Sequence, residues 1–479
     1  MAIRLYNTLS REIEDFKPLK QGEARMYTCG PTVYNYPHIG NYRTYIFEDL
    51  LKRYLEYRGF KVLHVMNITD VDDKTIRDSQ KEGVPLKTFT TRYEAAFFED
   101  IKKLNIEPAD YYPRATETIP EMVAIIKKLI EKGYAYKGED GSWYYSISKF
   151  KDYGKLSHMD MSQLKAGARV AQDEYEKQQL ADFALWKLWD EKDGDVYWET
   201  ELGKGRPGWH IECSAMSMKY LGPHFDIHCG GVDNMFPHHE NEIAQSEAAN
   251  DEKFVNYWLH SEHLIVDGKK MSKSLGNFYT LRDLLDKGYH PKAIRWLLLS
   301  THYKQQLNFT FDALKSASKT VQNLLDFALR LRYVTGEPKP EAKPEIDQKV
   351  DGLIRKFQSA FEENMDEDLH ISEALAVLFE FVGEINKLLV SNKLGAENAA
   401  KALSALKKID KVLGVIGEPV GVPENILKII EERKAVRKAK DWKKGDELRD
   451  TIKSMGYVVM DAGEETIVSL SVVRKEDVD

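Results

Sequence analysis

The chain has 479 residues, of which 42% are hydrophobic and 30% are charged, and its formal net charge is −8 at pH 7. These values are typical of a soluble globular protein with several domains, and they argue against a uniformly basic nucleic-acid coat. No apolar run reaches the ~18 residues of a membrane helix, and the only cysteines, Cys29, Cys213 and Cys229, are too few for a disulfide framework. We therefore expect no membrane partner and a reducing cytoplasm.

The first predicted elements form a strand, a helix and a second strand. Residues 25–29 (RMYTC) indicate a short buried strand, and a loop rich in Gly, Pro and Asn follows. Residues 43–59 place apolar side chains at helical spacing until Gly59 ends the helix. Residues 60–69 (FKVLHVMNIT) indicate a second buried strand, so this unit predicts a parallel sheet. The acidic residues 70–73 lack the Gly and Glu of a calcium-binding EF-hand loop and are expected to cap a helix.

The rest of the chain changes character several times. Turns and short aromatic strands between about 133 and 200 indicate an insertion, after which the sheet is expected to resume in 208–222 and 225–233. A helix is expected to open at 236, and a long helical region precedes a final helical pair with short strands. We predict an α/β fold, with a Rossmann-type parallel-sheet domain that carries an insertion, then a helical bundle, then a small C-terminal α/β domain. The predicted domain ranges are 1–118 with 200–260, 119–199, 261–315, 316–418 and 419–479.

Two short segments have the composition of anion-binding sites. Residues 37–41 (PHIGN) end a loop and open a helix, where backbone N–H groups and the positive end of the helix dipole meet. Residues 267–277 (DGKKMSKSLGN) hold three lysines and two serines, and a lysine supplies a mobile charge for a phosphate. The order of a P-loop is absent. Taken alone, the first segment is more often a simple turn, and the second an ordinary solvated loop.

Residues 233–245 (DNMFPHHENEIAQ) place two histidines beside two glutamates. The segment is not a zincin motif, because its His-Glu pair is followed three positions later by Ile243 where that motif has a second His. On a helix, His238 and Glu242 share a face, and Glu240 points elsewhere. Cysteines without a C-x-x-C pair are a weak zinc signal and are more often small buried hydrophobes. These residues alone leave metal binding, acid–base chemistry and helix solvation open.

Taken together, the motifs resemble one family. "HIGN" and "KMSKS" are similar to the paired signature of the class I aminoacyl-tRNA synthetases. The longer segments resemble the cysteinyl-tRNA synthetases: "YTCGPTVYNYPHIGNYRTYIFEDLLKRYL", "NITDVDDKTI", "RPGWHIECSAM", "HFDIHCGGVDNMFPHHENEIAQSEA", "KMSKSLGNF" and "RKAKDW". The resemblance covers nearly the whole chain and is weakest between about 315 and 420. It implies ATP-dependent activation of L-cysteine, transfer to tRNA(Cys), and a catalytic Rossmann domain.

The resemblance also implies a zinc site, with one Zn²⁺ per chain. The positions that match the family's zinc ligands are Cys29, Cys213, His238 and Glu242. A soft thiolate binds zinc far better than a neutral alcohol does, so zinc would select cysteine over serine without an editing domain. His239 and Glu240 are then expected to be polar residues at the start of a helix, or to support the metal ligands.

Further residues are expected to bind ATP and cysteine. His38 and Asn41 would donate to the phosphates from one side, and Lys270 and Lys273 would hold the leaving pyrophosphate from the other. Mg²⁺ should accompany ATP. Other expected contacts are Gly40, Gly230, Gly231 and Asp233 for ATP, and Thr69 and Trp209 for cysteine. Two residues depart from the family pattern, Asn41 in place of the signature's last His and Cys229 in place of an expected Gly, and we expect the Cys229 thiol to be sensitive to oxidation.

The C-terminal region is locally basic within an acidic chain. Residues 421–460 carry ten Lys and Arg against seven Asp and Glu. Read alone, this is most simply a charged helix with a buried Trp, whereas the resemblance implies an anticodon-binding domain. The residues expected to contact tRNA are Arg437, Trp442, Asp446 and Asp461. Two alternatives remain: a cysteine ligase that acts on an amino sugar, and an inactive RNA-binding paralogue. A monomer is expected.

Overall fold

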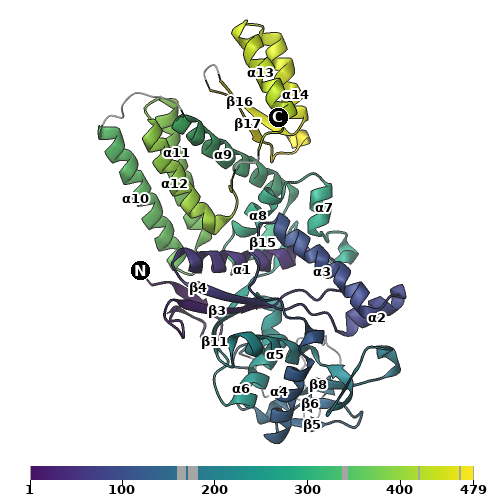
Figure 1. The fold of residues 1–479 in the computed structure, drawn as a ribbon. Coiled ribbons are helices and arrows are strands. Elements are labelled where there is room, and N and C mark those ends of the chain that lie inside the picture. Colours follow the sequence, from purple (N-terminus) through teal and green to yellow (C-terminus); the bar gives the residue numbers. More distant parts are fainter. Residues whose placement is uncertain are drawn as a thin grey trace. The chain divides into compact units, whose positions relative to one another are not determined.

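We describe a computed structural model of the chain, for residues 2–158, 169–170, 182–336, 344–418, 421–462 and 465–477. The chain divides into two compact units (Figure 1). The first comprises Met1–Ile265, Tyr303–Leu307 and Asp366–Leu369, and the second comprises Val266–His302, Asn308–Met365 and His370–Asp479. Among the described residues, none of the helices has both the length and the apolar character needed to span a membrane.

The centre of the first unit is a parallel sheet of four strands, as the sequence predicts. The strands lie in the order β12 (Val255–Ser261), β11 (Phe225–Gly231), β3 (Glu23–Thr28) and β4 (Lys61–Met66). Helix α1 (Ile39–Tyr57) joins β3 to β4, which confirms the predicted βαβ unit. It lies on one face of the sheet, and helices α5 (Trp209–Leu221) and α6 (Glu240–Asn250) lie on the other (Figure 1).

Local capping explains where the first helices begin and end. His38 Nδ1 accepts from the Asn41 N–H and Asn41 Oδ1 accepts from the His38 N–H, which starts α1 with a reciprocal cap. The chain leaves α1 through Gly59, whose φ is +90°. The prediction for 70–73 is confirmed, because the Asp72 side chain accepts from the Thr75 N–H at the start of α2 (Asp73–Glu82).

One expectation is wrong. Residues 208–222 were expected to continue the sheet, but they form helix α5, which ends at Gly222 with φ +88°. Every residue from His210 to Ser217 is buried. A helix that is buried all round lacks the 3.6-residue alternation of polar and apolar positions, so its sequence resembles a buried strand.

In its described residues the first unit also contains a second sheet, a hairpin and three further α-helices. The second sheet has the order β5–β6–β8–β10–β9, with β7 paired to β8. Its strands are β5 (Ala135–Lys137), β6 (Trp143–Tyr145), β7 (Arg169–Val170), β8 (Asp182–Leu188), β9 (Trp198–Thr200) and β10 (Gly203–Pro207). The hairpin is β1 (Arg4–Asn7) with β2 (Glu12–Asp15), and the remaining helices are α2, α3 (Leu86–Lys103) and α4 (Ile119–Glu131).

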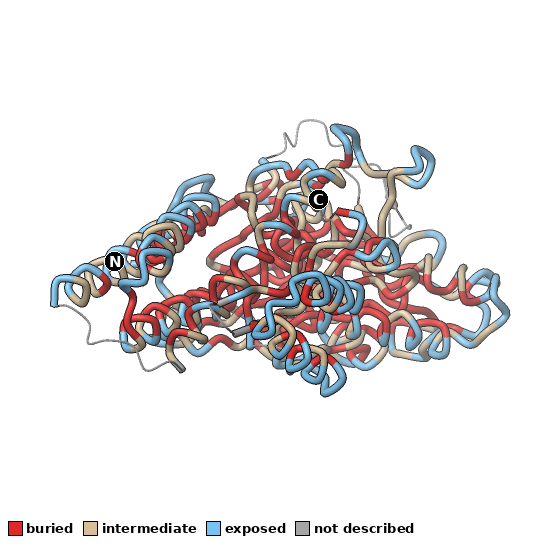
Figure 2. The backbone as a smooth tube through the Cα atoms, turned by 90° about the horizontal axis from the view of Figure 1, so that it is seen from above, coloured by how far each residue is buried: buried red, intermediate tan, exposed pale blue. Residues whose placement is uncertain are grey.

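A small sheet lies where the chain passes into the second unit, with the order β14–β13–β15. Its strands are β13 (Leu264–Val266), β14 (Lys269–Lys270) and β15 (Leu307–Phe309). The helices that follow are α7 (Leu281–Asp286), α8 (Pro291–Leu299), α9 (Phe311–Gly336), α10 (Pro344–Asp366), α11 (Ile371–Val390) and α12 (Ala396–Leu413). The last elements are α13 (Glu424–Lys438), α14 (Trp442–Ser454), β16 (Tyr457–Ala462) and β17 (Glu465–Leu470). Figure 2 shows buried residues gathered in the interior and exposed residues along the outer faces of the helices.

The predicted fold class is confirmed: a parallel-sheet α/β domain, a helical region and a small C-terminal domain with strands.

Candidate metal and nucleotide site

The four predicted zinc ligands lie together in the core of the first unit. Cys29 follows strand β3, Cys213 lies on α5, and Glu242 lies on α6. His238 belongs to a turn, Met235–His239, that immediately precedes α6. One donor atom from each of the four residues lies within 4.8 Å of the other three, and all four residues are buried.

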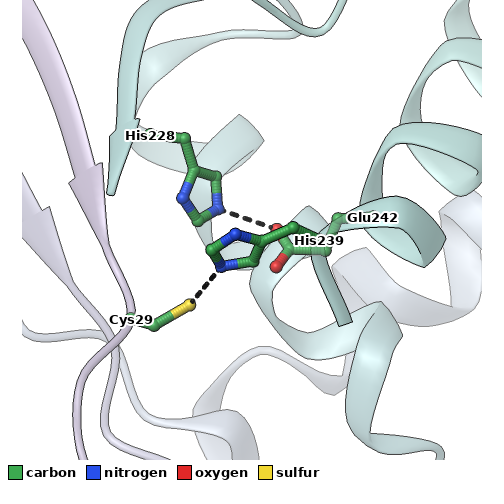
Figure 3. Close-up of side chains that lie close together, drawn as sticks. All are labelled: Cys29, His228, His239 and Glu242. Atoms are coloured by element: carbon green, nitrogen blue, oxygen red, sulfur yellow. Dashed lines mark hydrogen bonds and ion pairs between the residues drawn. The ribbon is translucent and has the colours of Figure 1, made fainter. Parts of the chain in front are cut away.

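A second set of donors overlaps the first. Cys29 and Glu242 also lie within 4.8 Å of His228 and His239. Figure 3 shows His239 pointing at the Cys29 sulfur and His228 pointing at the Glu242 carboxylate. The distances are 3.2 Å from His239 Nε2 to Cys29 Sγ and 3.0 Å from His228 Nε2 to Glu242 Oε2.

The groups of the first set share protons with one another, and this sharing shifts their pKa values. A hydrogen bond to Cys213 and burial raise the pKa of Cys29, so Cys29 holds the shared proton. Burial alone would raise the pKa of Cys213, but the hydrogen bond from Cys29 and the charge of His238 lower it to about 6. Burial opposes a charged His238, yet the Cys213 thiolate and Glu242 raise its pKa to about 10. Without a metal, a buried imidazolium therefore balances the anions.

The residues present fit a zinc ion. Zinc takes four ligands from thiolate, imidazole and carboxylate groups, and the first set supplies two sulfurs, one nitrogen and one oxygen. The Glu242 Oε1 atom is buried and, within the described chain, makes no hydrogen bond of acceptable geometry, although it lies 3.1 Å from His238 Nε2. A buried carboxylate oxygen without a hydrogen bond is costly unless another partner, such as a metal, binds it.

Sequence reasoning missed His228. His239 is fully buried against Cys29, which favours its expected supporting role over that of a solvated residue at a helix start. His228 lies on β11, two positions before Gly230, in a buried strand that also carries Asp226. An isolated His on such a strand was the signal that could have identified it. Glu240 does point elsewhere, as predicted, and accepts hydrogen bonds from backbone N–H groups of the loop at 154–157.

The two residues predicted for cysteine binding lie beside this cluster. The Trp209 ring stacks on the His238 ring with centroids 4.3 Å apart. Thr69 Oγ1 accepts from Asn67 Nδ2 at 3.0 Å and donates to Glu212 Oε2 at 3.3 Å. One aromatic wall and one oriented hydroxyl therefore flank the candidate metal centre.

The predicted ATP residues of the first unit also lie together. Burial lowers the pKa of His38, while the nearby Asp233 carboxylate opposes this shift. Because His38 Nδ1 accepts from the Asn41 N–H, a neutral ring carries its proton on Nε2, which is the nitrogen that can donate to a phosphate. A Cβ at Gly231 would lie 2.5 Å from Asp233 Oδ1, so a larger residue there would displace the Asp233 carboxylate. Gly40 is in the first turn of α1.

Gly230 lies against the histidine cluster, and Cys229 lies in the core. A Cβ at Gly230 would lie 2.7 Å from His239 Cε1, so this glycine is packed against the histidine cluster. The Cys229 side chain is fully buried, and burial together with the charge of Glu48 raises its pKa well above the usual range. A buried protonated thiol reacts poorly, so the expected sensitivity of Cys229 to oxidation is not supported.

The lysines of the second signature lie on a loop of the second unit. Lys270 ends strand β14, and Lys273 opens a short turn, Lys273–Leu275. Both side chains are exposed. Lys273 Nζ lies 5.3 Å from the centre of the Phe278 ring, a cation–π distance.

The four residues predicted to contact tRNA are in the last domain. Trp442 is 59% exposed at the start of α14, and the Arg437 guanidinium lies 5.8 Å from the centre of its ring. Asp446 is exposed on α14. Asp461 accepts from the buried Arg433 at 2.6 Å and also pairs with Arg437. The Asp461 carboxylate is therefore already bound by two arginines of its own domain.

Comparison with known proteins gives matches along almost the whole chain. Sequence profiles match at residues 15–319 (tRNA synthetases class I (C) catalytic domain), 360–417 (DALR domain) and 420–467 (cysteinyl-tRNA ligase anticodon binding domain). The Cysteine–tRNA ligase of Protochlamydia amoebophila is 52% identical over 470 residues, which cover 97% of each chain. That of Chlamydia muridarum is 50% identical over 471 residues, covering 96% of this chain and 98% of the relative.

Solved structures of class I synthetases share the fold at low identity. Methionyl-tRNA synthetase of Mycobacterium tuberculosis, in complex with methionyl-adenylate, has a TM-score of 0.62 at 15% identity, covering 83% of this chain and 90% of that one. The leucyl enzyme of Agrobacterium radiobacter has a TM-score of 0.59 at 12% identity, with coverages of 84% and 85%. On the strength of the full-length relatives and the three profiles, the chain belongs to the cysteine–tRNA ligase family of class I aminoacyl-tRNA synthetases.

Proposed function

We propose that the protein activates L-cysteine with ATP and transfers it to tRNA(Cys), and that zinc selects the cysteine side chain. The observation that carries the zinc-dependent step is the buried set of two thiols, one imidazole and one carboxylate, with donor atoms within 4.8 Å of one another. A relative that matches 97% of the chain and bears the name Cysteine–tRNA ligase supports the overall reaction.

The reaction has two steps. In the first, a carboxylate oxygen of cysteine attacks the α-phosphorus of ATP, the bond to the bridging oxygen breaks, and pyrophosphate leaves. In the second, the 2′-hydroxyl of the terminal adenosine of tRNA attacks the activated carbonyl carbon, and AMP leaves. No covalent intermediate with the enzyme is needed, so the protein contributes positioning and charge stabilisation.

The chain's own residues supply the nucleotide contacts. His38 Nε2 and Asn41 Nδ2 donate to phosphate oxygens, because the other polar atoms of these side chains are engaged in the α1 cap. Lys270 and Lys273 neutralise the charge that builds up on the leaving pyrophosphate. Asp233 accepts from a ribose hydroxyl, and Mg²⁺ accompanies ATP.

Selection of cysteine uses the cluster around α5 and α6. Held by Cys29, Cys213, His238 and Glu242, zinc supplies a soft Lewis acid that favours a thiolate over the hydroxyl of serine. The Trp209 ring covers the adjacent His238 ring and excludes water from this side. The Thr69 hydroxyl, oriented by Asn67 and Glu212, has one remaining lone pair that can accept from the substrate.

The direct test is cysteine-dependent exchange of pyrophosphate into ATP, followed by transfer of cysteine to a tRNA transcript. We expect both reactions with cysteine and neither with serine, and we expect exchange to be lost in Cys213→Ala together with bound zinc. Exchange without transfer to tRNA would favour the amino-sugar ligase. Absence of exchange in the wild-type protein would favour an inactive RNA-binding paralogue.

The domain assignment, location and assembly state complete the proposal. The predicted ranges 316–418 and 419–479 are supported by profile matches at 360–417 and 420–467. An anticodon-binding domain is needed only for a tRNA substrate, and its match counts against the sugar ligase. We also propose that the protein works as a monomer in the cytoplasm, where tRNA is charged.

A further inference from the structure

The loop that carries Lys270 and Lys273 is held by the side-chain amide of one residue, Asn277. Asn277 Oδ1 accepts from the Ser272 N–H at 2.8 Å, and Asn277 Nδ2 donates to the Lys270 carbonyl at 3.2 Å. A single planar amide thus bonds the backbone on both sides of Met271. The two bonds fix the path of the chain between the two lysines.

A tight turn after Ser272 brings the chain back, so that Asn277 lies beside Lys270. Ser272 Oγ accepts from the Leu275 N–H at 3.3 Å and caps the turn Lys273–Leu275. Gly276 then adopts φ +66°, which brings Asn277 back toward Lys270. A Cβ at Gly276 would meet no atom within 4 Å, so the backbone conformation, not lack of space, requires glycine here.

The residues that hold this loop are more enclosed than the lysines. Lys270 and Lys273 are exposed, whereas Asn277 and Phe278 are half-buried. Lys270 is the last residue of β14, so its carbonyl belongs to a segment that is tied to the small sheet. The amide of Asn277 therefore connects the sheet to the turn that carries Lys273, and the Phe278 ring supports the Lys273 ammonium group.

We propose that Asn277 is a positioning residue for the activation step. It holds the backbone in the conformation from which Lys270 and Lys273 both reach the leaving pyrophosphate. This inference rests on the proposed function. Lysine side chains lose rotamer freedom when they are fixed on a ligand, and a backbone with several accessible conformations would lose further entropy at the same step. Because charge on the pyrophosphate grows in the transition state, misplacement of the lysines lowers kcat more than it weakens binding of cysteine.

Three variants of the full-length protein test the proposal in the exchange assay. Asn277→Ala removes both hydrogen bonds and should lower kcat about tenfold with an unchanged KM for cysteine. Asn277→Asp keeps the acceptor for Ser272 and loses the donor to Lys270, so its kcat should lie between that of the wild type and that of Asn277→Ala. Asn308→Ala is the matched control, because Asn308 Oδ1 accepts from the Gly268 N–H at 2.9 Å but does not bond the segment between the lysines. We expect its kcat to equal that of the wild type.

A double-mutant cycle separates positioning from general damage. If Asn277 acts through Lys273, Asn277→Ala should change kcat less than twofold when Lys273 is already alanine. An equal loss in both backgrounds, or an Asn277→Ala variant as active as the Asn308→Ala control, overturns the proposal. If Asn277→Ala has a lowered thermal midpoint, Asn277→Asp is the variant placed in the cycle. A wild-type protein without cysteine-dependent exchange refutes the proposed function itself, whereas the inference is judged only among variants of an active wild type.

Discussion

Zinc binding should release about two protons at pH 7.5, because metal ligands must be deprotonated to bind. In the metal-free protein the pKa of Cys213 is about 6 and that of Glu242 is lowered by the two neighbouring histidines, although burial opposes this second shift. These two groups are already anionic at pH 7.5. Cys29 has a raised pKa and His238 has a pKa of about 10, so each carries a proton that a metal must displace.

The sign and size of the pH dependence follow from this count. With two protons released, zinc affinity falls about a hundredfold for each unit by which the pH is lowered from 8.5 to 6.5. Below pH 6 the Cys213 thiolate also takes up a proton, and the dependence becomes steeper. If zinc instead bound the second donor set, which includes His239 in place of His238, the number of released protons would differ. Burial lowers the pKa of His239 and leaves that ring neutral, so Cys29 and His239 together would release only one proton.

Calorimetric titration of zinc into chelator-stripped protein, in buffers with different ionisation enthalpies, measures the number of protons directly. Two matched substitutions assign them. His238→Gln should greatly weaken binding, whereas His239→Gln should retain it and leave the release at two protons. Release of one proton by the wild type, or a His238→Gln variant that binds zinc as tightly as the wild type, would refute the assignment of Cys213 and His238 as ligands.

Three further substitutions test other parts of the protein. Asn41→Asp keeps the acceptor for the His38 N–H and so should retain the thermal midpoint, but it replaces the NH₂ donor by a carboxylate and should lower the exchange rate at least tenfold; an unchanged rate would exclude a phosphate contact. Gly230→Ala places a methyl group 2.7 Å from the His239 ring and should cost about 1–3 kcal/mol of stability by overpacking; an unaltered unfolding midpoint would contradict this. Trp442→Ala removes a side chain that is 59% exposed and should leave exchange and stability intact while raising the KM for tRNA about tenfold; a lowered midpoint would indicate a structural role instead.

The parallel sheet and its crossover helix could be predicted because their sequence patterns are local. Strands β3 and β4 are short and mostly buried segments, and α1 lies between a capping segment and Gly59. Helix α5 could not be recognised in the same way. Its burial on all sides removes the amphipathic pattern on which sequence reasoning depends, and its packing against the sheet comes from residues distant in the chain.

The histidine pair was difficult for a different reason. On a regular helix Glu242 lies four positions after His238 and three after His239, so helical spacing allows either ring to share its face and does not distinguish their roles. The structure interrupts the helix before α6: Phe236 has φ −135° and ψ 133°, and the turn Met235–His239 is not a regular α-helix. Both rings are buried as a result, which no periodic pattern in the sequence could indicate.

The second donor set is best understood as support for the first. Its members Cys29 and His239 are linked to Thr8 and His260: Thr8 Oγ1 lies 2.9 Å from His260 Nδ1, and His260 Nε2 lies 2.8 Å from His239 Nδ1. Because the Cys29 proton is shared with Cys213, we assign donation in one direction, from the Thr8 hydroxyl through His260 and from His239 Nε2 to Cys29 Sγ. This order needs each ring to be neutral, and burial lowers the pKa of His260 to about 3 and that of His239 as well. A His239 ring that donates to the Cys29 sulfur cannot use the same nitrogen to bind a metal. The chain of imidazoles therefore orients Cys29 as a ligand, in the way that outer groups commonly orient the ligands of a metal.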